Sequence, residues 1–294
     1  LADPGTRTTI IYFHANAEDL STAELWLQEL RDHLGVSILA VEYPGYGLHQ
    51  HPDVSEDCDA TTVEGIDAAA MHALQYAVLR LGVPSTEVVL YGRSLGSGPA
   101  LRLAQRARDE LAWSVGGVIL HSPCISMKQV AIDHAGRLGA LLVDTYYDNL
   151  AAVRELCRPN PAPSGRRWTP LLILHGEMDD IVAPRHGRAL FREALEHGHQ
   201  SAEASFPPFA THGDWDTIQD VIPPVIKFLQ RHLVAPLKVT PPPILGSGLS
   251  AAKLPERPLH EFDLRPLGAD WHSEFAAENR FCEKQACDRL LAPL

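Results

Sequence analysis

The sequence predicts an α/β protein with a mostly parallel sheet and helices on both faces. Short runs of β-branched, aromatic and other apolar residues recur along the chain, as expected for buried strands. Segments with helical spacing separate most of these runs, and this alternation is typical of a parallel sheet. The predicted strands are Thr8–Phe13, Val36–Val41, Glu87–Tyr91, Val115–Leu120, Leu171–His175 and Ala202–Phe206.

The helices between these strands carry recognisable start and stop signals. The first is expected to begin with Ser21 or Thr22 as its N-cap and to end at Gly35. The last has Pro223 and Pro224 in its first turn, where proline suits helix geometry. The other predicted helices are Thr61–Leu81, Gly96–Arg108, Ala135–Asp144 and Pro184–Glu196.

Changes in composition divide the chain. Residues 1–234 are expected to form one large α/β domain, with an irregular, partly helical, cap-like insert at about 121–168. After residue 234 the strand pattern stops, and residues 235–294 are predicted to be a proline-rich extension, part linker and part docking segment. The chain starts at Leu1, not Met, and enters a strand almost at once, so we expect that an upstream segment has been removed.

Composition and charge exclude several classes of partner and site. The net charge is −12, and Lys and Arg are scattered, so nucleic acid is not an expected partner. The five cysteines are odd in number and form no Cys-x-x-Cys pair, which favours a reducing, cytoplasmic compartment over disulfides or zinc. No apolar run approaches the roughly 18 residues of a membrane span. No metal or organic cofactor is expected.

The most specific motif is Gly-Arg-Ser-Leu-Gly at 92–96, which has the pattern Gly-x-Ser-x-Gly. It lies between a predicted strand and a predicted helix, the context in which this pattern marks a nucleophilic serine on a sharp turn. The flanking glycines are needed because side chains there would collide. The helix N-terminus favours negative charge at the same point. We therefore expect Ser94 to be a nucleophile.

A serine nucleophile requires a base and a carboxylate that orients the base. In this arrangement the chain order is serine, acid, histidine. Asp179 follows the predicted fifth strand, where Glu177 and Asp180 compete for the acid role. His212, one of 15 histidines, is singled out by its place after the last predicted strand. The predicted triad is Ser94, Asp179 and His212.

The loop after the first strand is expected to supply half of an oxyanion hole. In this arrangement one backbone N–H comes from that loop, and the other from the residue after the nucleophile. We assign these donors to Asn16, in the string HANA (14–17), and to Leu95. Asn16 is expected to act through its main chain rather than its side chain.

Five strings resemble the family of α/β-hydrolase-domain-containing protein 17. They are FHANAEDL (13–20), VEYPGYG (41–47), VVLYGRSLGSGPAL (88–101), GVILHSPC (117–124) and LLILHGEMDDIV (171–182). The resemblance implies an α/β-hydrolase fold and a serine hydrolase that removes palmitate from cytoplasmic protein cysteines, with Ser94, Asp179 and His212 as its triad. Related serine-aminopeptidase-like hydrolases share most of these strings. The lipid-modified N-terminus of the family implies peripheral membrane attachment through an upstream segment.

Two positions depart from that family's pattern. Ala15 stands where glycine is usual, and Arg93 stands where an uncharged residue is usual. We interpret Arg93 as a solvated side chain, and the alternative is that it attracts an anionic group beside the nucleophile. Glu18 and Asp19 are interpreted only as acidic residues at the start of a helix, and Cys124 as a buried, inert thiol.

Three functional hypotheses follow from the sequence. The first is an acyl hydrolase acting on an acylated protein or a small acyl ester. The second keeps the serine chemistry but takes a peptide, as a serine aminopeptidase does, or a small lipid ester. The third is a non-catalytic binding module on the same scaffold. A set of residues is expected to form either an acyl-chain wall or a small cap: Leu138, Leu141, Leu142 and Val143.

Overall fold

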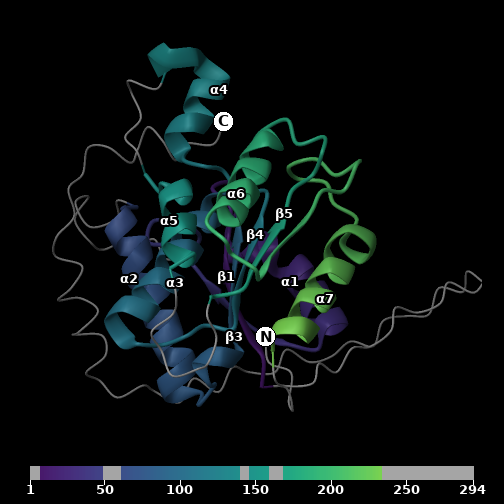
Figure 1. Ribbon diagram of the computed structural model, residues 1–294. Helices are drawn as coiled ribbons and strands as arrows, with labels where there is room; N and C mark the ends of the chain where they lie inside the picture. Colours follow the sequence, from purple (N-terminus) through teal and green to yellow (C-terminus); the bar gives the residue numbers. More distant parts are fainter. Residues whose placement is uncertain (1–6, 49–60, 140–145, 159–167, 234–294) are drawn as a thin grey trace, which may run out of the picture.

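The computed structural model describes residues 7–48, 61–139, 146–158 and 168–233, which contain a six-stranded sheet (Figure 1). Every strand is parallel to its neighbours, in the order β2-β1-β3-β4-β5-β6. This confirms the predicted fold class, and each strand lies within two residues of its predicted ends. The strands are β1 (Thr9–Phe13), β2 (Ser37–Val41), β3 (Val88–Arg93), β4 (Gly117–His121), β5 (Leu171–Leu174) and β6 (Ala202–Ser205).

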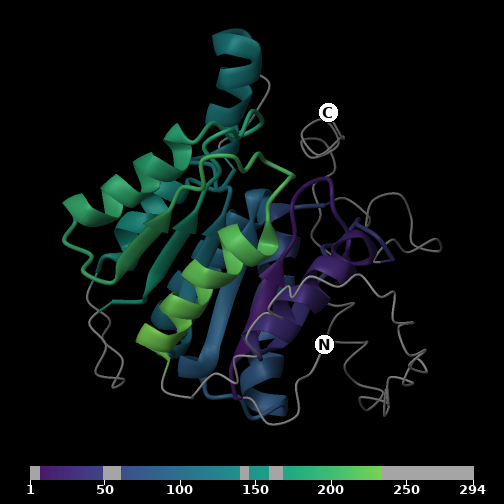
Figure 2. The ribbon, with the colours of Figure 1, turned by 90° about the vertical axis from the view of Figure 1, so that its right-hand side faces the viewer.

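Side chains alternate across the sheet and form an apolar core on each face. In β1, Ile11 and Phe13 pack into one core, and Ile10 and Tyr12 into the other. Figure 2 shows α1 and α7 side by side over one face of the sheet. The first core also takes residues from α2, α3, α5 and α6. These helices are α1 (Leu20–Leu34), α2 (Val63–Gln75), α3 (Ser97–Leu111), α5 (Asn149–Leu156), α6 (Arg185–Glu196) and α7 (Ile222–His232).

The start of α1 differs from the prediction. Asp19 is the N-cap: its carboxylate accepts the Thr22 N–H at 2.8 Å, while the Thr22 hydroxyl oxygen accepts the Asp19 N–H at 2.9 Å. This reciprocal capping box satisfies two backbone donors and sets the helix start at Leu20. The predicted caps Ser21 and Thr22 therefore lie inside the first turn. Gly35 ends the helix in the left-handed conformation (φ 62°), as predicted.

The other helices keep close to their predicted segments. The long helix predicted after residue 60 is observed as α2, with Thr62 as its N-cap, followed by a π-helical turn, Tyr76–Arg80. A second π-helical turn, Thr217–Val221, leads into α7, whose first turn contains the predicted pair of prolines. No helix in the described part of the chain is both long and apolar enough to cross a membrane.

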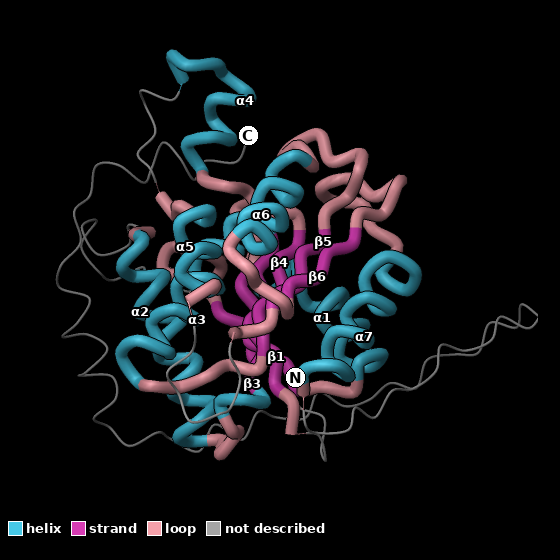
Figure 3. The backbone as a smooth tube through the Cα atoms, in the orientation of Figure 1, coloured by secondary structure: helices cyan, strands magenta, loops and turns pink. Residues whose placement is uncertain are grey.

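The segment between β4 and β5 differs most from the prediction. Helix α4 (Met127–Gly139) begins eight residues before the predicted Ala135 and is broken at Gly136, where φ is 67°. Figure 3 shows α4 standing beyond the layer of the sheet. By contrast, α5 contributes buried side chains to the core. Residues 140–145, the 159–167 segment and the predicted extension 235–294 lie outside the described residues.

The strand order brings distant loops to one edge of the sheet. From β1 the chain moves outward to β2 and then crosses back to β3 on the other side of β1. The loops after β1 and β3 therefore lie next to each other at their carboxyl ends, the switch point at which such sheets place their sites. The loops after β5 and β6 open at the same edge, because all strands run in one direction.

Candidate active site

The backbone around Ser94 forms a sharp turn between β3 and α3. Ser94 opens a single 3₁₀ turn, Ser94–Gly96, and its φ is 50°, a conformation that costs a non-glycine residue energy. A Cβ on Gly92 would lie 2.2 Å from the Gly96 carbonyl oxygen, so only glycine fits there. The structure therefore shows the strained serine turn with close-packed glycines that the sequence predicts.

Gly96 also fixes this turn against β1. A Cβ at Gly96 would lie 2.2 Å from the carbonyl oxygen of Phe13, the last residue of β1. Since the backbones approach this closely, the loop that begins at His14 is held beside the serine turn. The two loops assigned to the oxyanion hole are thus neighbours.

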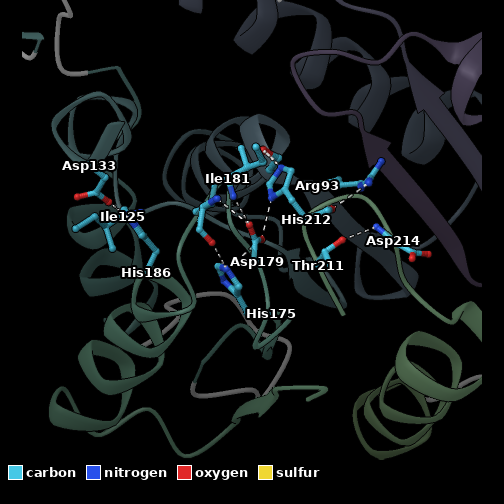
Figure 4. A network of polar contacts seen from close by, with 12 residues as sticks. Arg93, Ile125, Asp133, His175, Asp179, Ile181, His186, Thr211, His212 and Asp214 are labelled. Carbon is cyan, nitrogen blue, oxygen red and sulfur yellow. Dashed lines mark hydrogen bonds and ion pairs between the residues drawn. The ribbon is translucent and has the colours of Figure 1, made fainter. Parts of the chain in front are cut away.

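Three side chains from separate loops form a hydrogen-bonded row. His212 Nε2 lies 3.1 Å from Ser94 Oγ, and His212 Nδ1 lies 2.8 Å from Asp179 Oδ2 (Figure 4). An ionised carboxylate only accepts, so Nδ1 carries the ring proton and Nε2 is free to accept the Ser94 hydroxyl proton. The structure brings together the three residues that the sequence singles out.

Asp179 is buried and held in its ionised form. Its Oδ1 accepts the N–H groups of Ile181 (3.1 Å) and Val182 (2.7 Å). Burial alone would raise the pKa of this carboxyl, but hydrogen bonds from His175, His212 and the Val182 N–H lower the pKa well below its ordinary value. Asp179 therefore remains a carboxylate at neutral pH.

His175 is a supporting residue that sequence reasoning missed. Its ring is fully buried, with Nε2 2.7 Å from the Val182 carbonyl oxygen and 3.3 Å from Asp179 Oδ2. The shorter contact is the main hydrogen bond, and the longer one places a donor beside the carboxylate. A histidine four residues before an aspartate after a strand is the only signal for this pair in the sequence.

The two competing acids have other surroundings. Glu177 forms an ion pair with Arg188, which lowers the pKa of its carboxyl, and Asp180 is exposed. Within the part of the chain that the structure describes, neither Glu177 nor Asp180 accepts a hydrogen bond from His212. Of the three candidate acids, only Asp179 reaches the histidine.

Backbone contacts join the acid loop to the histidine loop. Met178 N–H donates to the Ala210 carbonyl at 3.0 Å, and Glu177 N–H donates to the Pro207 carbonyl at 2.9 Å. Gly176 lies so close that a Cβ would be 2.2 Å from the Ala210 oxygen. The loop after β5 and the loop after β6 therefore form one unit.

The oxyanion loop is fixed through the Ala15 peptide. The Ala15 carbonyl accepts a hydrogen bond from His14 Nδ1 at 2.8 Å and one from the Glu18 N–H at 3.2 Å. In a trans peptide the following N–H, that of Asn16, points in the opposite direction. The Asn16 side chain is occupied separately, because its Oδ1 accepts the Tyr46 hydroxyl at 2.6 Å. This leaves the Asn16 main chain, rather than its side chain, for the predicted role.

The expectation of a solvated Arg93 is wrong. Its guanidinium forms an ion pair with Glu18, and its Nη2 donates to the His212 carbonyl oxygen at 3.3 Å. Burial lowers the pKa of Arg93 from its ordinary value, and the Tyr12 hydroxyl and Asp179 oppose this shift. Glu18 is likewise more than an acidic residue before a helix. Sequence reasoning missed the pair because its members lie 75 positions apart, on different loops.

Other residues near the site are structural. Cys124 is buried, and burial raises the pKa of its thiol to about 12, as expected for an inert cysteine. Tyr43 is fully buried, and its hydroxyl donates to the His14 carbonyl at 2.9 Å. Among the described residues, no group of three or more His, Cys, Asp or Glu side chains is arranged to hold a metal ion.

Comparison with known proteins gives the family. A strained serine turn beside a histidine and a buried aspartate, at the carboxyl edge of a parallel sheet, is the arrangement of the α/β hydrolases. Residues 10–201 match the family described as the alpha/beta hydrolase fold. The chain therefore belongs to the α/β-hydrolase fold family.

Within this fold family, the chain is similar to α/β hydrolase domain-containing proteins of animals. The chain is 26% identical over 231 residues to α/β hydrolase domain-containing protein 17C of Xenopus tropicalis, covering 78% of this chain and 64% of that protein. It is 26% identical over 211 residues to α/β hydrolase domain-containing protein aho-3 of Caenorhabditis elegans, covering 72% and 54%. The resemblance to protein 17 is thus confirmed, and the chain spans less than two thirds of the length of these relatives.

Solved structures share the fold. An esterase of Pyrococcus furiosus superimposes with a TM-score of 0.56 at 15% identity, over 79% of this chain and 84% of that one. A monoacylglycerol lipase of Paleococcus ferrophilus gives a TM-score of 0.51 at 19% identity, over 77% and 95%. At these identities the similarity concerns the fold alone. The family match and the solved structures therefore agree on the α/β-hydrolase fold.

Proposed function

We propose that this protein is a serine hydrolase that cleaves acyl esters or thioesters through a covalent acyl-enzyme. The observation that carries the proposal is the hydrogen-bonded row of Ser94, His212 and Asp179, with distances of 3.1 and 2.8 Å. A neutral serine becomes nucleophilic only when a base takes its proton. His212 is within reach of that proton, and Asp179 holds the ring in the required tautomer.

The reaction runs in two balanced halves. Ser94 Oγ attacks the carbonyl carbon while its proton passes to His212 Nε2, and the carbonyl oxygen becomes an oxyanion facing the N–H groups of Asn16 and Leu95. The bond to the thiolate or alkoxide leaving group then breaks, and that group takes the proton from Nε2. Water next gives a proton to Nε2 and attacks the acyl-enzyme. Breakdown returns the proton to Ser94 and releases a carboxylic acid.

An apolar acyl group suits the surroundings of this row. Large apolar side chains are exposed on the two loops that carry the acid and the base: Met178 (57%), Ile181 (43%) and Phe209 (83%). Exposed apolar side chains on the loops that carry reactive groups favour an apolar ligand. With the resemblance to protein 17, this supports a palmitoylated protein as substrate. Of the predicted acyl-chain wall, Leu141, Leu142 and Val143 lie outside the described residues, and so does the side chain of Leu138.

A fluorophosphonate probe tests the mechanism. Labelling of the parent protein is expected to disappear in Ser94→Ala, and turnover of a thioester to fall by about 10⁴-fold or more. Ser97→Ala is the matched control, since Ser97 is a buried serine one turn along the same backbone. Labelling that survives Ser94→Ala would remove Ser94 as the nucleophile. A folded parent that is never labelled would favour a non-catalytic binding module.

A rate comparison tests the substrate class. The parent is offered a palmitoyl-cysteine peptide, a monoacylglycerol and an aminoacyl amide under identical conditions. The proposal expects the highest kcat/KM for the thioester. Preference for the monoacylglycerol would indicate a lipid-ester hydrolase, and preference for the amide a serine aminopeptidase.

A further inference from the structure

We propose that Glu18 and Arg93 act together as positioning residues that lock the oxyanion loop, the serine turn and the His212 loop into one geometry. The inference rests on the proposed hydrolase function and deepens it. Neither residue touches the reacting atoms; each acts through the main chain of residues that do. The case depends on what each end of the ion pair holds.

Glu18 holds the oxyanion loop. One carboxylate oxygen, Oε2, accepts the Ala15 N–H at 3.0 Å and the Tyr12 hydroxyl at 3.1 Å. The Glu18 main chain also donates to the Ala15 carbonyl. Both polar groups of Ala15 are therefore held, so the next peptide, which carries the Asn16 N–H, has a fixed orientation. Tyr12, itself fully buried, anchors the carboxylate to β1.

Arg93 holds the other two loops. It immediately precedes Ser94, so its backbone is part of the serine turn. One guanidinium nitrogen, Nη1, pairs with Glu18 Oε1, while the second, Nη2, donates to the His212 carbonyl at 3.3 Å. A guanidinium presents several donors in a rigid plane and can bridge two acceptors at once. Figure 4 shows Arg93 alongside His212, on the side opposite Asp179.

The pair is shielded enough to be rigid. The side chains of Glu18 and Arg93 are only 15% and 18% exposed. A shielded pair loses more than an exposed one when a single partner is removed, because the other charge is left unpaired. His212 is thus held at two points, with Asp179 on the ring and Arg93 on the carbonyl. Small displacements of such a base lower the rate steeply.

A double-mutant cycle tests this coupling. Glu18→Gln, Arg93→Gln and the double variant are compared with the parent in hydrolysis of 4-nitrophenyl butyrate. Each single change is expected to lower kcat by about tenfold to a hundredfold while KM stays within about threefold. The double variant is expected to have a kcat no lower than that of the less active single variant, because both changes break the same ion pair.

A control pair separates positioning from general stability. Arg102 on α3 pairs with the buried Asp67 on α2 at 2.8 Å, between helices that carry none of the proposed catalytic residues. Arg102→Gln is expected to lower the melting temperature and to leave kcat and KM unchanged. If Arg93→Gln does not fold, Arg93→Lys replaces it. Lysine keeps the charge beside Glu18 but offers one nitrogen, so kcat should still fall.

The outcomes divide cleanly. A loss of kcat in both single variants, without further loss in the double variant, supports the inference. Unchanged kcat in folded Glu18→Gln or Arg93→Lys, losses that multiply, or an effect on KM alone would overturn it. If the parent itself neither hydrolyses the ester nor reacts with the fluorophosphonate, the proposed function fails instead.

Discussion

The two halves of the sheet position their reactive groups by different means. In the half formed by β1 and β3, Ser94 is placed by backbone geometry: a positive φ, two glycines and a close approach to Phe13. In the half formed by β5 and β6, several backbone contacts join the loops. The orientations of Asp179 and His212, however, come from hydrogen bonds to side chains and to the turn after Asp179.

The two means of positioning should respond differently to substitution, one through the stability of the fold and the other through activity. A backbone that must approach within contact distance tolerates no added atom, so changes there disrupt the fold as well as the site. A hydrogen bond can be removed by an isosteric substitution that leaves the packing intact. Substitutions in the first half should therefore lower the stability of the fold, and substitutions in the second half should lower the rate of hydrolysis while the protein stays folded. Three substitution experiments test this contrast.

The largest effect is expected for Gly96→Ala. The added methyl would lie 2.2 Å from the Phe13 carbonyl oxygen, so β1 and the serine turn must separate. We expect destabilisation by more than about 3 kcal/mol, a melting temperature lower by about 10 °C, and no measurable hydrolysis. Gly213→Ala, beside His212, is the control, because nothing lies within 4 Å of its added Cβ. Equal melting temperatures for the two variants would contradict the contrast.

Asp179→Asn should damage the catalyst and spare the fold. The amide oxygen can still accept the Ile181 and Val182 N–H groups, but the amide nitrogen then faces His212 Nδ1 and favours the wrong ring tautomer. The expected loss is about 10⁴-fold in kcat, with the fold intact by circular dichroism. A loss below about tenfold would mean that Asp179 is not the acid of the proposed mechanism. Glu177→Gln serves as the control acid.

The smallest effect is a pH dependence of stability that comes from buried histidines on the β4–β6 side of the sheet. Burial lowers the pKa of three histidines there: His121, His186 and His199. The unfolded chain takes up protons near pH 6.5 while the folded protein resists, so stability is lost as pH falls below that value. The slope for each histidine reaches at most about 1.4 kcal/mol per pH unit.

Urea unfolding at pH 7.5 and 5.5 measures this slope. His199→Gln keeps a donor for the Thr169 carbonyl, which His199 contacts at 2.9 Å, but removes the titrating ring. The difference in stability between the two pH values should shrink. His197→Gln, two residues away and exposed, is the comparison variant. A pH dependence identical in both variants would rule out His199 as a contributor.

Local pattern was enough to predict the strands and the serine turn. Apolar runs between polar segments give buried strands, and Gly-x-Ser-x-Gly between a strand and a helix leaves few conformations open. The helix in the β4–β5 segment was misplaced, because Gly136 interrupts a pattern that continues on both sides of it. The start of α1 was misjudged because the side chains of Asp19, Ser21 and Thr22 can all cap a helix, and only Asp19 has the reciprocal partner.

Contacts between side chains that are far apart in the sequence could not be predicted from local sequence patterns. Position after the last strands singled out Asp179 and His212, although position alone did not separate Asp179 from its acidic neighbours. Arg93 was misjudged because its partner, Glu18, lies on a different loop and resembles an ordinary acidic residue before a helix. The support that His175 gives depends on the turn at Val182, whose carbonyl it meets only in the folded protein.

The capping box of α1 limits the length of the loop before it. Asp19 begins the helix, and Glu18, one position earlier, holds Ala15 and Arg93. One residue added between Ala15 and Glu18 would shift the chain by about 3.8 Å and leave either the helix start or the carboxylate misplaced. A short, partly exposed loop of this kind usually varies in length freely. Here it should keep a constant length in every relative that retains both charges.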